Sequence, residues 1–550
     1  MKNLTSFSKK MKKTTAFILS SITILMTFVL AAPSAGAAVV EENPSLSKPS
    51  DSAKIKSASG LPSKYSSVDL GYVTSVKKQS AKNCWVYGSL ATVESFLLKN
   101  GIVFPELSTY HLDKWGTPDE RGLGWQRTLG SGALHLLPMG YFVSRQGPFA
   151  KADDTSQESF AGININAIEY ITMENPTRIK ELIYQCGAVT ANYNNGGMKY
   201  FNTDKTAFYC YDQNAEIEGH SVSVVGWDDD YPKENFTSCG ATPNENGAWL
   251  VKNSWGDYNP LHGYFWISYE DLFIFSDVFS DSYAVLSAEK SSEFQKLYQN
   301  ETYGATYGFD YLAEKQNVTY MNFYDFSDGY DRLNKVIFET ESKGADYSVY
   351  YVPAEDENIV TDTSRWTLVS RGTVDYDGYI CVDTGGFQLP LGYGAIAVTI
   401  DTQKVNEGVP FSDDNYVDNV IGVDEWLVKA GTKEYLFLNE SGYNESFLMF
   451  DGKFYDMKDY YARELGDDIG ATAVIKAEAE NTSQEPPKAT LAGDADLNGQ
   501  VSIKDVTIVQ MFLANLRKSS VIRDLNSDMD NDGSVTVNDA AAIQIKLAHL

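Results

Sequence analysis

One helix-forming segment with a cysteine at its first position constrains the fold of this sequence more than any other feature. Apolar residues recur at helical spacing from residue 86 to residue 97, between Asn83, a favoured N-cap type, and the terminating pair Asn100-Gly101. This pattern predicts a helix over residues 84–100. The positive end of a helix dipole lowers the pKa of a thiol, so Cys84 in the first turn is a candidate nucleophile. A lone cysteine is more often a small buried apolar residue, and only partners elsewhere in the chain decide between the two interpretations.

The length and the charge of the chain limit its class. A chain of 550 residues is too long for one core and suggests roughly three or four domains. Aromatic residues make up 13%, with 35 Tyr, which favours β-structure with polar faces over disorder or a helical bundle. The net charge of -29 argues against nucleic acid or an anionic membrane as a partner and is compatible with cation binding.

The first 37 residues have the features of an export signal. Lysines between residues 9 and 13 precede an apolar run over residues 16–32, and Ala35-Gly36-Ala37 supplies a small-residue cleavage site. No second apolar stretch of membrane length follows. We therefore expect a signal peptide over residues 1–37 and a secreted, extracellular mature protein without a membrane span. Residues 38–60 are rich in Ser, Lys and Glu, which predicts a short flexible leader.

The five cysteines leave the disulfide state open. Their number is small for an exported chain of this length. If Cys84 stays free, Cys210 and Cys239 are the most favourable pair because they flank one segment. Four unpaired buried thiols are an equally fair interpretation.

Residues 61–290 show helical patterns and then strand patterns. Further helices are predicted around residues 132–145 and 176–185, and strands over residues 221–227, 248–253 and 263–269. Helices followed by strands indicate the α+β class. The acidic stretch 228–246 between two of these strands is expected to be a surface excursion, because its consecutive aspartates cannot be buried unpaired.

Short aromatic and β-branched runs dominate residues 294–476 and predict an all-β sandwich. The expected strands cover residues 317–323, 335–340, 347–352, 395–401 and 471–475, with a hairpin over 447–455 that turns at Asp451-Gly452. The tyrosines of these strands are either ordinary sheet-face residues, which the pattern favours, or platforms that stack on sugars. Residues 477–490, with Pro486-Pro487 and no apolar period, are predicted to be a linker.

Three polar residues complete an acyl-transfer site around Cys84. His220 opens a strand and is suited to act as general base and acid, because imidazole titrates near neutrality. Asn253 ends a later strand, and its amide oxygen can orient the imidazole, with Trp255 covering that bond from water. Gln79 and the backbone N–H of Cys84 are the expected donors to the oxyanion of a tetrahedral intermediate.

These residues stand in motifs that resemble those of the papain-like cysteine peptidases of the C1 family. The matching segments are Gln79 followed by Cys84-Trp85-Val86-Tyr87, the strand around Gly219 to Trp227, and Asn253-Ser254-Trp255-Gly256. His220 lies 136 residues after Cys84, close to the family spacing, and Asn253 lies 169 residues after it because of the acidic excursion. The resemblance implies a two-subdomain papain-like fold over residues 61–290. It also implies catalytic roles for Cys84, His220, Asn253 and Gln79.

The same resemblance implies substrate contacts and includes departures from the family pattern. Gly132, Ser221 and Trp255 fall where the family contacts its substrate. The segment from Gln79 to Cys84 is one residue shorter than usual and lacks the family's extra cysteine, which bears on the placement of Gln79 and on a disulfide common in the family. The leader is also shorter than the usual inhibitory pro-segment.

Two acidic loops near the C-terminus repeat with an offset of 34 residues. Each has oxygen-bearing side chains at loop positions 1, 3, 5 and 12, a backbone carbonyl at position 7 and glycine at position 6, as in calcium loops. The expected ligands of two Ca²⁺ ions are Asp494, Asp496, Asn498, Gln500 and Asp505, and in the second loop Asp528, Asp530, Asp532, Ser534 and Asp539. An acidic turn without metal is the alternative, which two copies in register disfavour.

A helix is expected after each loop but not before it, so the pair resembles a type I dockerin more closely than EF-hands. The resemblance covers residues 491–550 and implies a small all-α, calcium-binding module that docks into a cohesin domain of a scaffoldin, in a cellulosome at the cell surface. In that family the residues just before position 12 help to choose the cohesin; here they are Ile503, Lys504, Val537 and Asn538. More faintly, residues 294–476 resemble a lectin-like module, which implies carbohydrate as a further ligand.

Together these patterns predict a secreted cysteine endopeptidase that hydrolyses a protein or peptide substrate through a thioester on Cys84. His220 is its general base and acid, and catalysis needs no cofactor. The alternative is a non-catalytic or inhibitory papain-fold binding protein carried on the scaffold. The intact Cys84, His220 and Asn253 favour the enzyme, whereas the short segment after Gln79 mildly favours the alternative.

Overall fold

The chain forms two compact units in the structure, a computed structural model. It describes residues 60–548 except 121, 153–157, 172–175, 277, 280–281, 307–316, 356–357, 402–422, 426, 430–434, 439–442, 466–470, 484–490, 496–500, 514–526 and 530–534. The first unit takes in the described residues of 60–142, 147–290 and 428–436, and the second those of 143–146, 291–427 and 437–548. The predicted signal peptide and all of the predicted leader except residue 60 lie outside the described residues.

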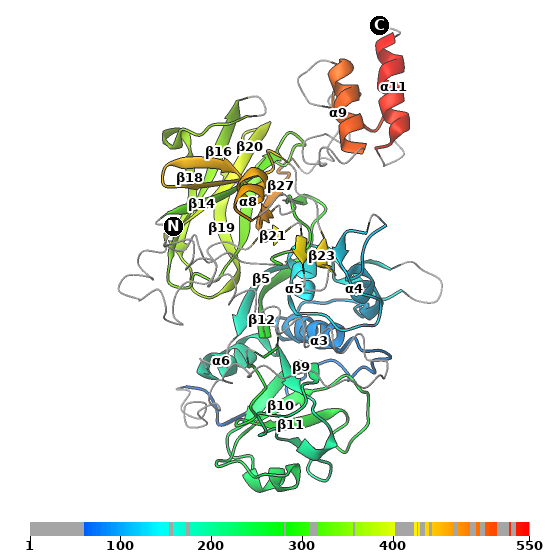
Figure 1. The fold of residues 1–550 in the computed structure, drawn as a ribbon, viewed down its shortest axis with the longest axis vertical. Coiled ribbons are helices and arrows are strands. Elements are labelled where there is room, and N and C mark those ends of the chain that lie inside the picture. Colours follow the sequence, from blue (N-terminus) through cyan, green and yellow to red (C-terminus); the bar gives the residue numbers. More distant parts are fainter. Residues whose placement is uncertain are drawn as a thin grey trace. The chain divides into compact units, whose positions relative to one another are not determined.

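The first unit combines a mainly antiparallel sheet with four described α-helices (Figure 1). The helices are α3 (Cys84–Lys99), α4 (Thr109–Trp115), α5 (Leu136–Val143) and α6 (Pro176–Cys186). The longer strands are β5 (Ile163–Ile171), β6 (Val189–Asn194), β9 (Gly219–Asp228), β10 (Ala248–Lys252), β11 (Tyr264–Ser268) and β12 (Ser282–Lys290). The short strands are β1 (Lys64–Ser66), β2 (Gly124–Trp125), β3 (Phe149–Ala150), β4 (Ser159–Phe160), β7 (Phe201–Asn202) and β8 (Ala207–Phe208). The strands of the sheet follow the order β5-β12-β6-β9-β10-β11-β8-β7, and α3 packs on β6, β9 and β12.

Helix α3 confirms the helix predicted over residues 84–100. The side chains predicted to face the core, Val86, Leu90, Val93 and Leu97, are 0–1% exposed, and the helix is followed by Gly101 with a φ of +67°. Gly88 allows α3 to approach β9 closely, because a Cβ there would lie 2.7 Å from Ser221 Oγ. Burial of this apolar face stabilises the helix and fixes its first turn against the sheet.

Other predictions for the first unit are confirmed in part. The helices expected near residues 132–145 and 176–185 are α5 and α6, and the three expected strands are β9, β10 and β11. Helix α4 was not predicted, and strand β5 lies between α5 and α6, so the predicted order of helices before strands is wrong. Within the acidic excursion Asp229 is buried, and it is paired: it accepts hydrogen bonds from Lys180 Nζ at 2.6 Å and Tyr269 Oη at 2.7 Å.

The second unit contains two sheets around a common apolar core. One has the order β13-β27-β15-β19 and the other β17-β16-β20-β14-β24-β25, with β18 paired to β16. Their bounds are β13 (Gln295–Tyr298), β14 (Val318–Asp325), β15 (Arg332–Thr340), β16 (Asp346–Glu355), β17 (Asn358–Ile359), β18 (Thr367–Thr373), β19 (Gly378–Gln388), β20 (Tyr393–Asp401), β24 (Ser446–Phe450), β25 (Lys453–Asp456) and β27 (Ile475–Glu480). The second unit also contains helix α8 (Met457–Leu465) and the short strands β21 (Val423–Glu425) and β26 (Ala471–Ala473). The short strands β22 (Leu427–Lys429) and β23 (Tyr435–Leu438) each have residues in both units.

Several tyrosines of the sandwich strands are buried in its core. The strand residues Tyr320, Tyr324 and Tyr379 are 0% exposed, and Tyr320 and Tyr324 join the apolar cluster formed by both sheets. This burial confirms the interpretation of tyrosines as ordinary sheet residues at these positions. The predicted hairpin turn is also present, since Asp451 and Gly452 have φ values of +49° and +68° between β24 and β25.

The start of the predicted linker is wrong. Residues 477–480 belong to β27, which pairs with β15 on one side and β13 on the other. The strand was missed because its inward face carries the small residues Ala477 and Ala479, both 0% exposed, which give no apolar signal among charged neighbours. Residues 484–490 of the predicted linker lie outside the described residues.

Two helices close the described chain. They are α9 (Ile503–Leu513) and α11 (Val537–Ala548), and they share a small core with Val506, Val509, Ala540 and Ile543. These are the helices predicted to follow the two acidic loops. Among the residues described, no helix is long and apolar enough to cross a membrane.

Candidate active site

Cys84 occupies the first position of α3, at the positive end of its dipole. Its Sγ accepts a hydrogen bond from the backbone N–H of Ser221 on β9 at 3.4 Å and is hydrogen-bonded to the side chain of His220. The structure therefore places the predicted nucleophile and the predicted base in contact, although 136 residues separate them in the sequence.

Antiparallel pairing of β9 with β10 brings the orienting amide to the same place. His220 is the second residue of β9, and Asn253 follows the last residue of β10. The ring atom His220 Nε2 lies 2.8 Å from Asn253 Oδ1, which also accepts the backbone N–H of Ser254 at 2.8 Å. The Trp255 ring lies 4.9 Å from the imidazole, centroid to centroid, so it covers this bond as predicted.

The electrostatics of the site favour a thiolate–imidazolium pair. Burial alone raises the pKa of the Cys84 thiol, but the charge and hydrogen bond of His220 and the backbone N–H groups of Ser221 and Trp85 outweigh it, and the pKa is lowered. Burial lowers the pKa of His220, while Cys84 and the hydrogen bond to Asn253 raise it further than burial lowers it. The Cys84 thiolate and the His220 imidazolium therefore stabilise each other.

The other described thiols of the first unit behave in the opposite way. Burial raises the pKa of Cys186 to about 12, of Cys210 to about 12 and of Cys239 to about 11. All five cysteines are free, so the pairing of Cys210 with Cys239 considered above is absent and the alternative of unpaired thiols holds.

We expect Cys84 to react with iodoacetamide at a nearly constant rate down to pH values well below 8.5, the ordinary pKa of a thiol. The reason is that proton transfer to His220 keeps sulfur anionic until the pair is protonated at acidic pH. Mass spectrometry of the Cys84 peptide against pH measures this rate. His220→Ala is the control, and in this variant the alkylation rate should rise only near or above pH 8.5. If the alkylation rate of the native protein also rises only there, the ion pair is contradicted.

Gln79 lies beside the nucleophile but is held by its own contacts. Its backbone N–H donates to the carbonyl of Ser254 at 2.7 Å, and its Oε1 accepts the Ser254 hydroxyl at 2.5 Å. Its Nε2 donates to the carbonyl of Ala81 at 2.7 Å. Because Ser254 follows Asn253 directly, the motif that orients His220 also fixes the oxygen end of the predicted oxyanion donor.

A buried ion pair ties the loop around Gly132 to the turn that carries Cys84. Arg127 Nη2 pairs with Asp113 Oδ1 at 2.7 Å and donates to the carbonyl of Ser131 at 2.6 Å, while Arg127 Nε donates to the carbonyl of Gly132 at 3.2 Å. Asp113 Oδ2 accepts Asn83 Nδ2 at 2.8 Å. The sequence predicts that the Asn83 side chain caps α3. It does not, because the carboxylate of Asp113 takes its amide instead.

Trp85 adds two further contacts between the turn of Cys84 and the loop around Gly132. Its Nε1 donates to the carbonyl of Ser131 at 3.0 Å, and the guanidinium of Arg127 lies 4.8 Å above its ring. Trp85 thus bonds directly to the segment that includes the predicted substrate contact at Gly132. Asn83, on the other side of Cys84, is linked to that segment through Asp113 and Arg127. This arrangement sets the distance between the nucleophile and that wall of the cleft.

The predicted substrate contact through the side chain of Ser221 is wrong. Ser221 is 2% exposed, and its hydroxyl is 2.8 Å from His135 Nε2, which is itself 1% exposed. The side chain faces inward because β9 is buried on both faces at this point. The contribution of Ser221 to the site is instead its backbone N–H, which stabilises the thiolate of Cys84.

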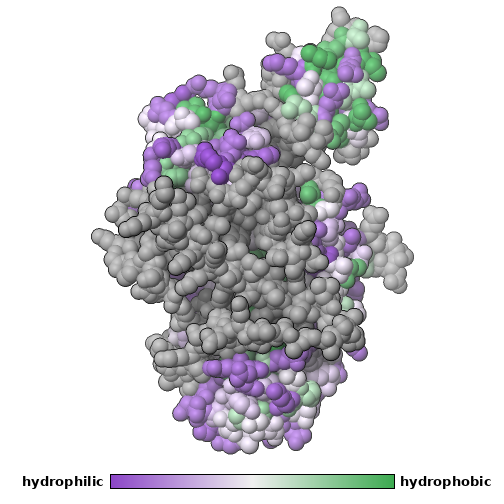
Figure 2. All heavy atoms as spheres, viewed as in Figure 1, coloured by the Kyte–Doolittle hydropathy of each residue, from purple (hydrophilic) through white to green (hydrophobic). Residues whose placement is uncertain are grey.

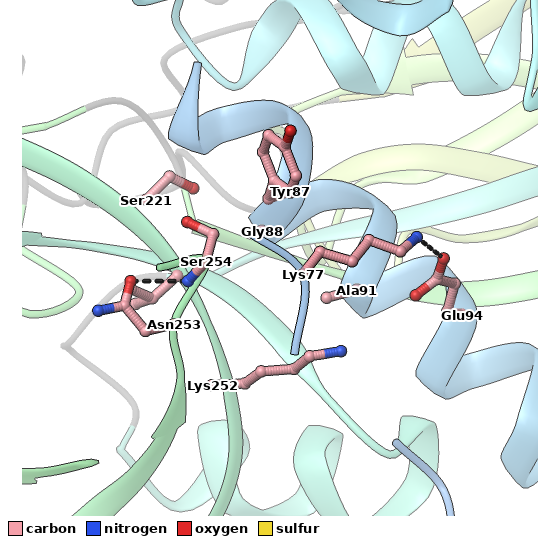
Figure 3. A pocket seen from close by; sticks show the side chains of 10 residues that line it. Lys77, Tyr87, Gly88, Ala91, Glu94, Ser221, Lys252, Asn253 and Ser254 are labelled. Atoms are coloured by element: carbon pink, nitrogen blue, oxygen red, sulfur yellow. Dashed lines mark hydrogen bonds and ion pairs between the residues drawn. The ribbon is translucent and has the colours of Figure 1, made fainter. Parts of the chain in front are cut away.

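A polar pocket lies along α3 and is lined in part by Ser221, Asn253 and Ser254 of the site (Figure 3). Lys77 and Glu94 form an ion pair of 2.5 Å on one side, and Lys252 donates to Thr74 Oγ1 at 3.0 Å on the other. Burial lowers the pKa of Lys252 to about 8. Neither Cys84 nor His220 lines this pocket, so it is not the place of reaction.

Sequence reasoning missed several residues around the site. His135, Asp113 and Arg127 carry no motif, and only the fold brings them to α3. Tyr258 stands two residues after the Asn253–Gly256 motif, which is a positional signal, and its hydroxyl accepts Asn253 Nδ2 at 3.0 Å.

Comparisons with known proteins agree with this geometry. Residues 61–274 match the model of the papain family cysteine proteases, and residues 297–477 match that of the lectin-like domain. A structure of the clostridial cysteine protease Cwp84 after propeptide cleavage is 32% identical, with a TM-score of 0.64, and the match covers 76% of this chain and 100% of that one. A structure of the cysteine protease and lectin-like domains of Cwp84, a surface layer associated protein of Clostridium difficile, is 31% identical, with the same TM-score, over 77% of this chain and 89% of that one.

A curated relative matches only the first part of the chain. Cathepsin J of Mus musculus is 24% identical over 228 residues, which are 38% of this chain and 61% of the cathepsin. The chain thus spans about three fifths of the length of that relative. The identity with Cwp84 along its whole resolved length, together with the two domain matches, shows the architecture of a papain-like peptidase fold followed by a β-rich lectin-like domain. This chain belongs to the papain family of cysteine proteases.

Proposed function

We propose that this protein is an exported cysteine endopeptidase that cleaves protein substrates. The observation that carries the proposal is the convergence of Cys84, His220 and Asn253, from one helix and two strands, into a hydrogen-bonded set with a lowered thiol pKa. A non-catalytic binding protein would have no use for such a charge-separated pair. The geometry therefore favours the enzyme over the alternative of a papain-fold binding or inhibitory protein.

The contacts define a role for each group in the reaction. The Cys84 thiolate attacks the peptide carbonyl, and the backbone N–H of Cys84 and the Gln79 amide are the donors expected to face the developing oxyanion. His220 gives its proton to the leaving amine, which leaves a thioester on Cys84. The imidazole then takes a proton from water, the resulting hydroxide attacks the thioester, and the acid product leaves with the thiol restored.

Turnover with active-site titration tests this proposal. We expect the purified protein to cleave an unfolded protein substrate in reducing buffer, and one equivalent of a thiol-directed epoxide to abolish cleavage. Peptide mapping should find the label on Cys84. Labelling without any cleavage of several unfolded substrates would favour the binding-protein alternative, and labelling distributed over other cysteines would contradict the assigned nucleophile.

The place of action proposed for this chain is outside the cell. The predicted signal peptide supports export, and the relative Cwp84 is described as surface layer associated. The sequence resemblance to dockerins suggests a different mode of attachment for this chain, through a cohesin of a scaffoldin. The lectin-like domain leaves carbohydrate as a second proposed ligand.

We also propose that residues 491–550 form a calcium-binding dockerin. The described parts of the two repeats are equivalent: Asp505 accepts the backbone N–H of Ala495 at 2.8 Å and of Ser502 at 2.7 Å. Asp539 accepts the corresponding N–H groups of Met529 at 2.7 Å and of Thr536 at 2.8 Å. At these described positions the second copy therefore makes the same contacts as the first.

The donor set fits calcium. Asp494, Asp505 and Asp539 are 0–2% exposed, and buried carboxylates favour a cation beside them. Oxygen-only ligands suit Ca²⁺, which would clip each loop to the start of its helix. Six of the predicted ligands, Asp496, Asn498, Gln500, Asp530, Asp532 and Ser534, lie outside the described residues. Among the residues that the structure does describe, no group of three His, Cys, Asp or Glu side chains is placed to hold a metal.

The exposed positions of the two helices support docking. Ile503 is 63% exposed and Val537 70% exposed at equivalent places, and Ile545 is 59% exposed on α11. Lys504 and Asn538, the other predicted contacts, are exposed beside them. Figure 2 shows hydrophobic side chains among polar ones on the surface of these helices. Apolar residues held in solvent at repeated positions are typical of a binding face.

A further inference from the structure

We propose that Tyr258 is a positioning residue for the reaction, because its phenol holds the side-chain amide of Asn253 in the orientation that His220 requires. This inference rests on the proposed peptidase function and adds a fourth member to the chain of contacts that runs from Cys84 through His220 to Asn253. The described hydrogen bonds of Tyr258 include neither the sulfur nor the imidazole, so it acts through Asn253.

The contacts of Asn253 define its orientation completely. Its Oδ1 accepts His220 Nε2 at 2.8 Å and the backbone N–H of Ser254 at 2.8 Å. Its Nδ2 donates to Tyr258 Oη at 3.0 Å. An amide rotated by 180° would bring its NH₂ group against two donors and its oxygen against the phenol. The two donors therefore fix which way the amide points, and the phenol, which can donate as well as accept, adds a third bond that holds the amide in that place.

The loop after β10 delivers Tyr258 to this place. Gly256 turns the chain with a φ of +75°, and Asn259 Oδ1 then accepts the backbone N–H groups of Leu261 and Gly263, each at 3.0 Å. Asn259 Nδ2 donates to the carbonyl of Tyr264 at 2.8 Å. These bonds give the loop a fixed shape, and the Tyr258 ring packs 5.4 Å from the Trp255 ring. Trp255 thus covers the hydrogen bond between Asn253 and His220, and Tyr258 supports it through Asn253.

The phenol also strengthens that bond electrostatically. When an amide N–H donates to an acceptor, its carbonyl becomes a better acceptor in turn. The imidazolium of His220 is then stabilised further, and with it the thiolate of Cys84. The other titratable groups around the imidazole are Glu218, which raises the His220 pKa, and Tyr193, whose ring meets the imidazole edge to face.

Replacing Tyr258 by Phe tests the proposal, because it removes only the hydroxyl. Tyr258 is 40% exposed, so the variant should fold. We expect kcat to fall about ten-fold, the effect of one lost hydrogen bond to a buried group, with KM nearly unchanged. We also expect the acidic limb of Cys84 alkylation by iodoacetamide to move to higher pH, since a less stable imidazolium holds the thiolate less well.

Tyr211→Phe is the matched control, because Tyr211 is also 40% exposed and lies outside these contacts. It should leave kcat and the alkylation profile unchanged. A Tyr258→Phe variant with native kcat and a native alkylation profile would overturn the proposal. If the native protein cleaves nothing, the peptidase proposal fails, and the alkylation profile alone then decides whether Tyr258 supports the ion pair.

Discussion

The Cys84→Ala variant is expected to lose protein hydrolysis by at least about 10³-fold, because no other group can form the thioester. The loss should appear in kcat, since substrate contacts around Gly132 and Trp255 remain. The fold should persist, because the substitution removes one sulfur atom, whose described partners are His220 and the backbone N–H groups of Ser221 and Trp85. The measurement is the initial rate of cleavage of an unfolded protein, with circular dichroism as the check of folding.

Cys381→Ala provides the control for that experiment. Cys381 forms no disulfide and is partly buried like Cys84, but it lies on β19 of the second unit. Its replacement should leave both the rate and the titration by a thiol-directed epoxide unchanged. Native activity in Cys84→Ala would rule out the whole mechanism, whereas loss of activity in both variants would point to an effect on folding.

Removal of calcium is expected to unfold the C-terminal module while the peptidase unit stays folded and active. Binding at a free calcium concentration 1,000 times Kd stabilises the bound state by about 4 kcal/mol. For a module of this size that corresponds to a fall in its Tm of roughly 20 °C when the ion is withdrawn. The buried Asp505 and Asp539 would be the groups left without their cation.

Calorimetry of the full chain with and without a calcium chelator measures this effect as the shift of one transition. The double variant Asp505→Asn and Asp539→Asn should reproduce the shift in the presence of calcium, and excess Mg²⁺ should not reverse it, because Mg²⁺ demands a smaller octahedral site. A cohesin that binds the native chain should be released in parallel. Unchanged transitions and unchanged cohesin binding in excess chelator would refute the calcium proposal.

Local pattern was a sufficient guide for several elements with a face of large apolar residues. The helix from Cys84 and the strands around His220 and Asn253 were predictable for this reason, and the hairpin at Asp451-Gly452 was predictable from its turn residues. Strand β5 was missed although it carries buried isoleucines. Strand β27 was not predictable, because alanines form its inward face. The burial of Asp229 was missed because its partners, Lys180 and Tyr269, come from distant elements.

The catalytic residues themselves could be found from the sequence because each stands in a short motif with a fixed chemical role. Their surroundings could not. Asn83 has the chemistry of a cap, yet the carboxylate of Asp113 offers it a stronger partner, and no pattern of neighbours foretells that choice. The inward turn of Ser221 follows from burial of both faces of β9, which only the packed sheet reveals.

The tie between Asp113 and Arg127 has a consequence for how the protein matures. Every described contact that holds the segment of Gly132 to the turn of Cys84 is non-covalent, and none of the five cysteines, all of them among the described residues, forms a disulfide. Assembly of this part of the site therefore needs no oxidant and no disulfide isomerase.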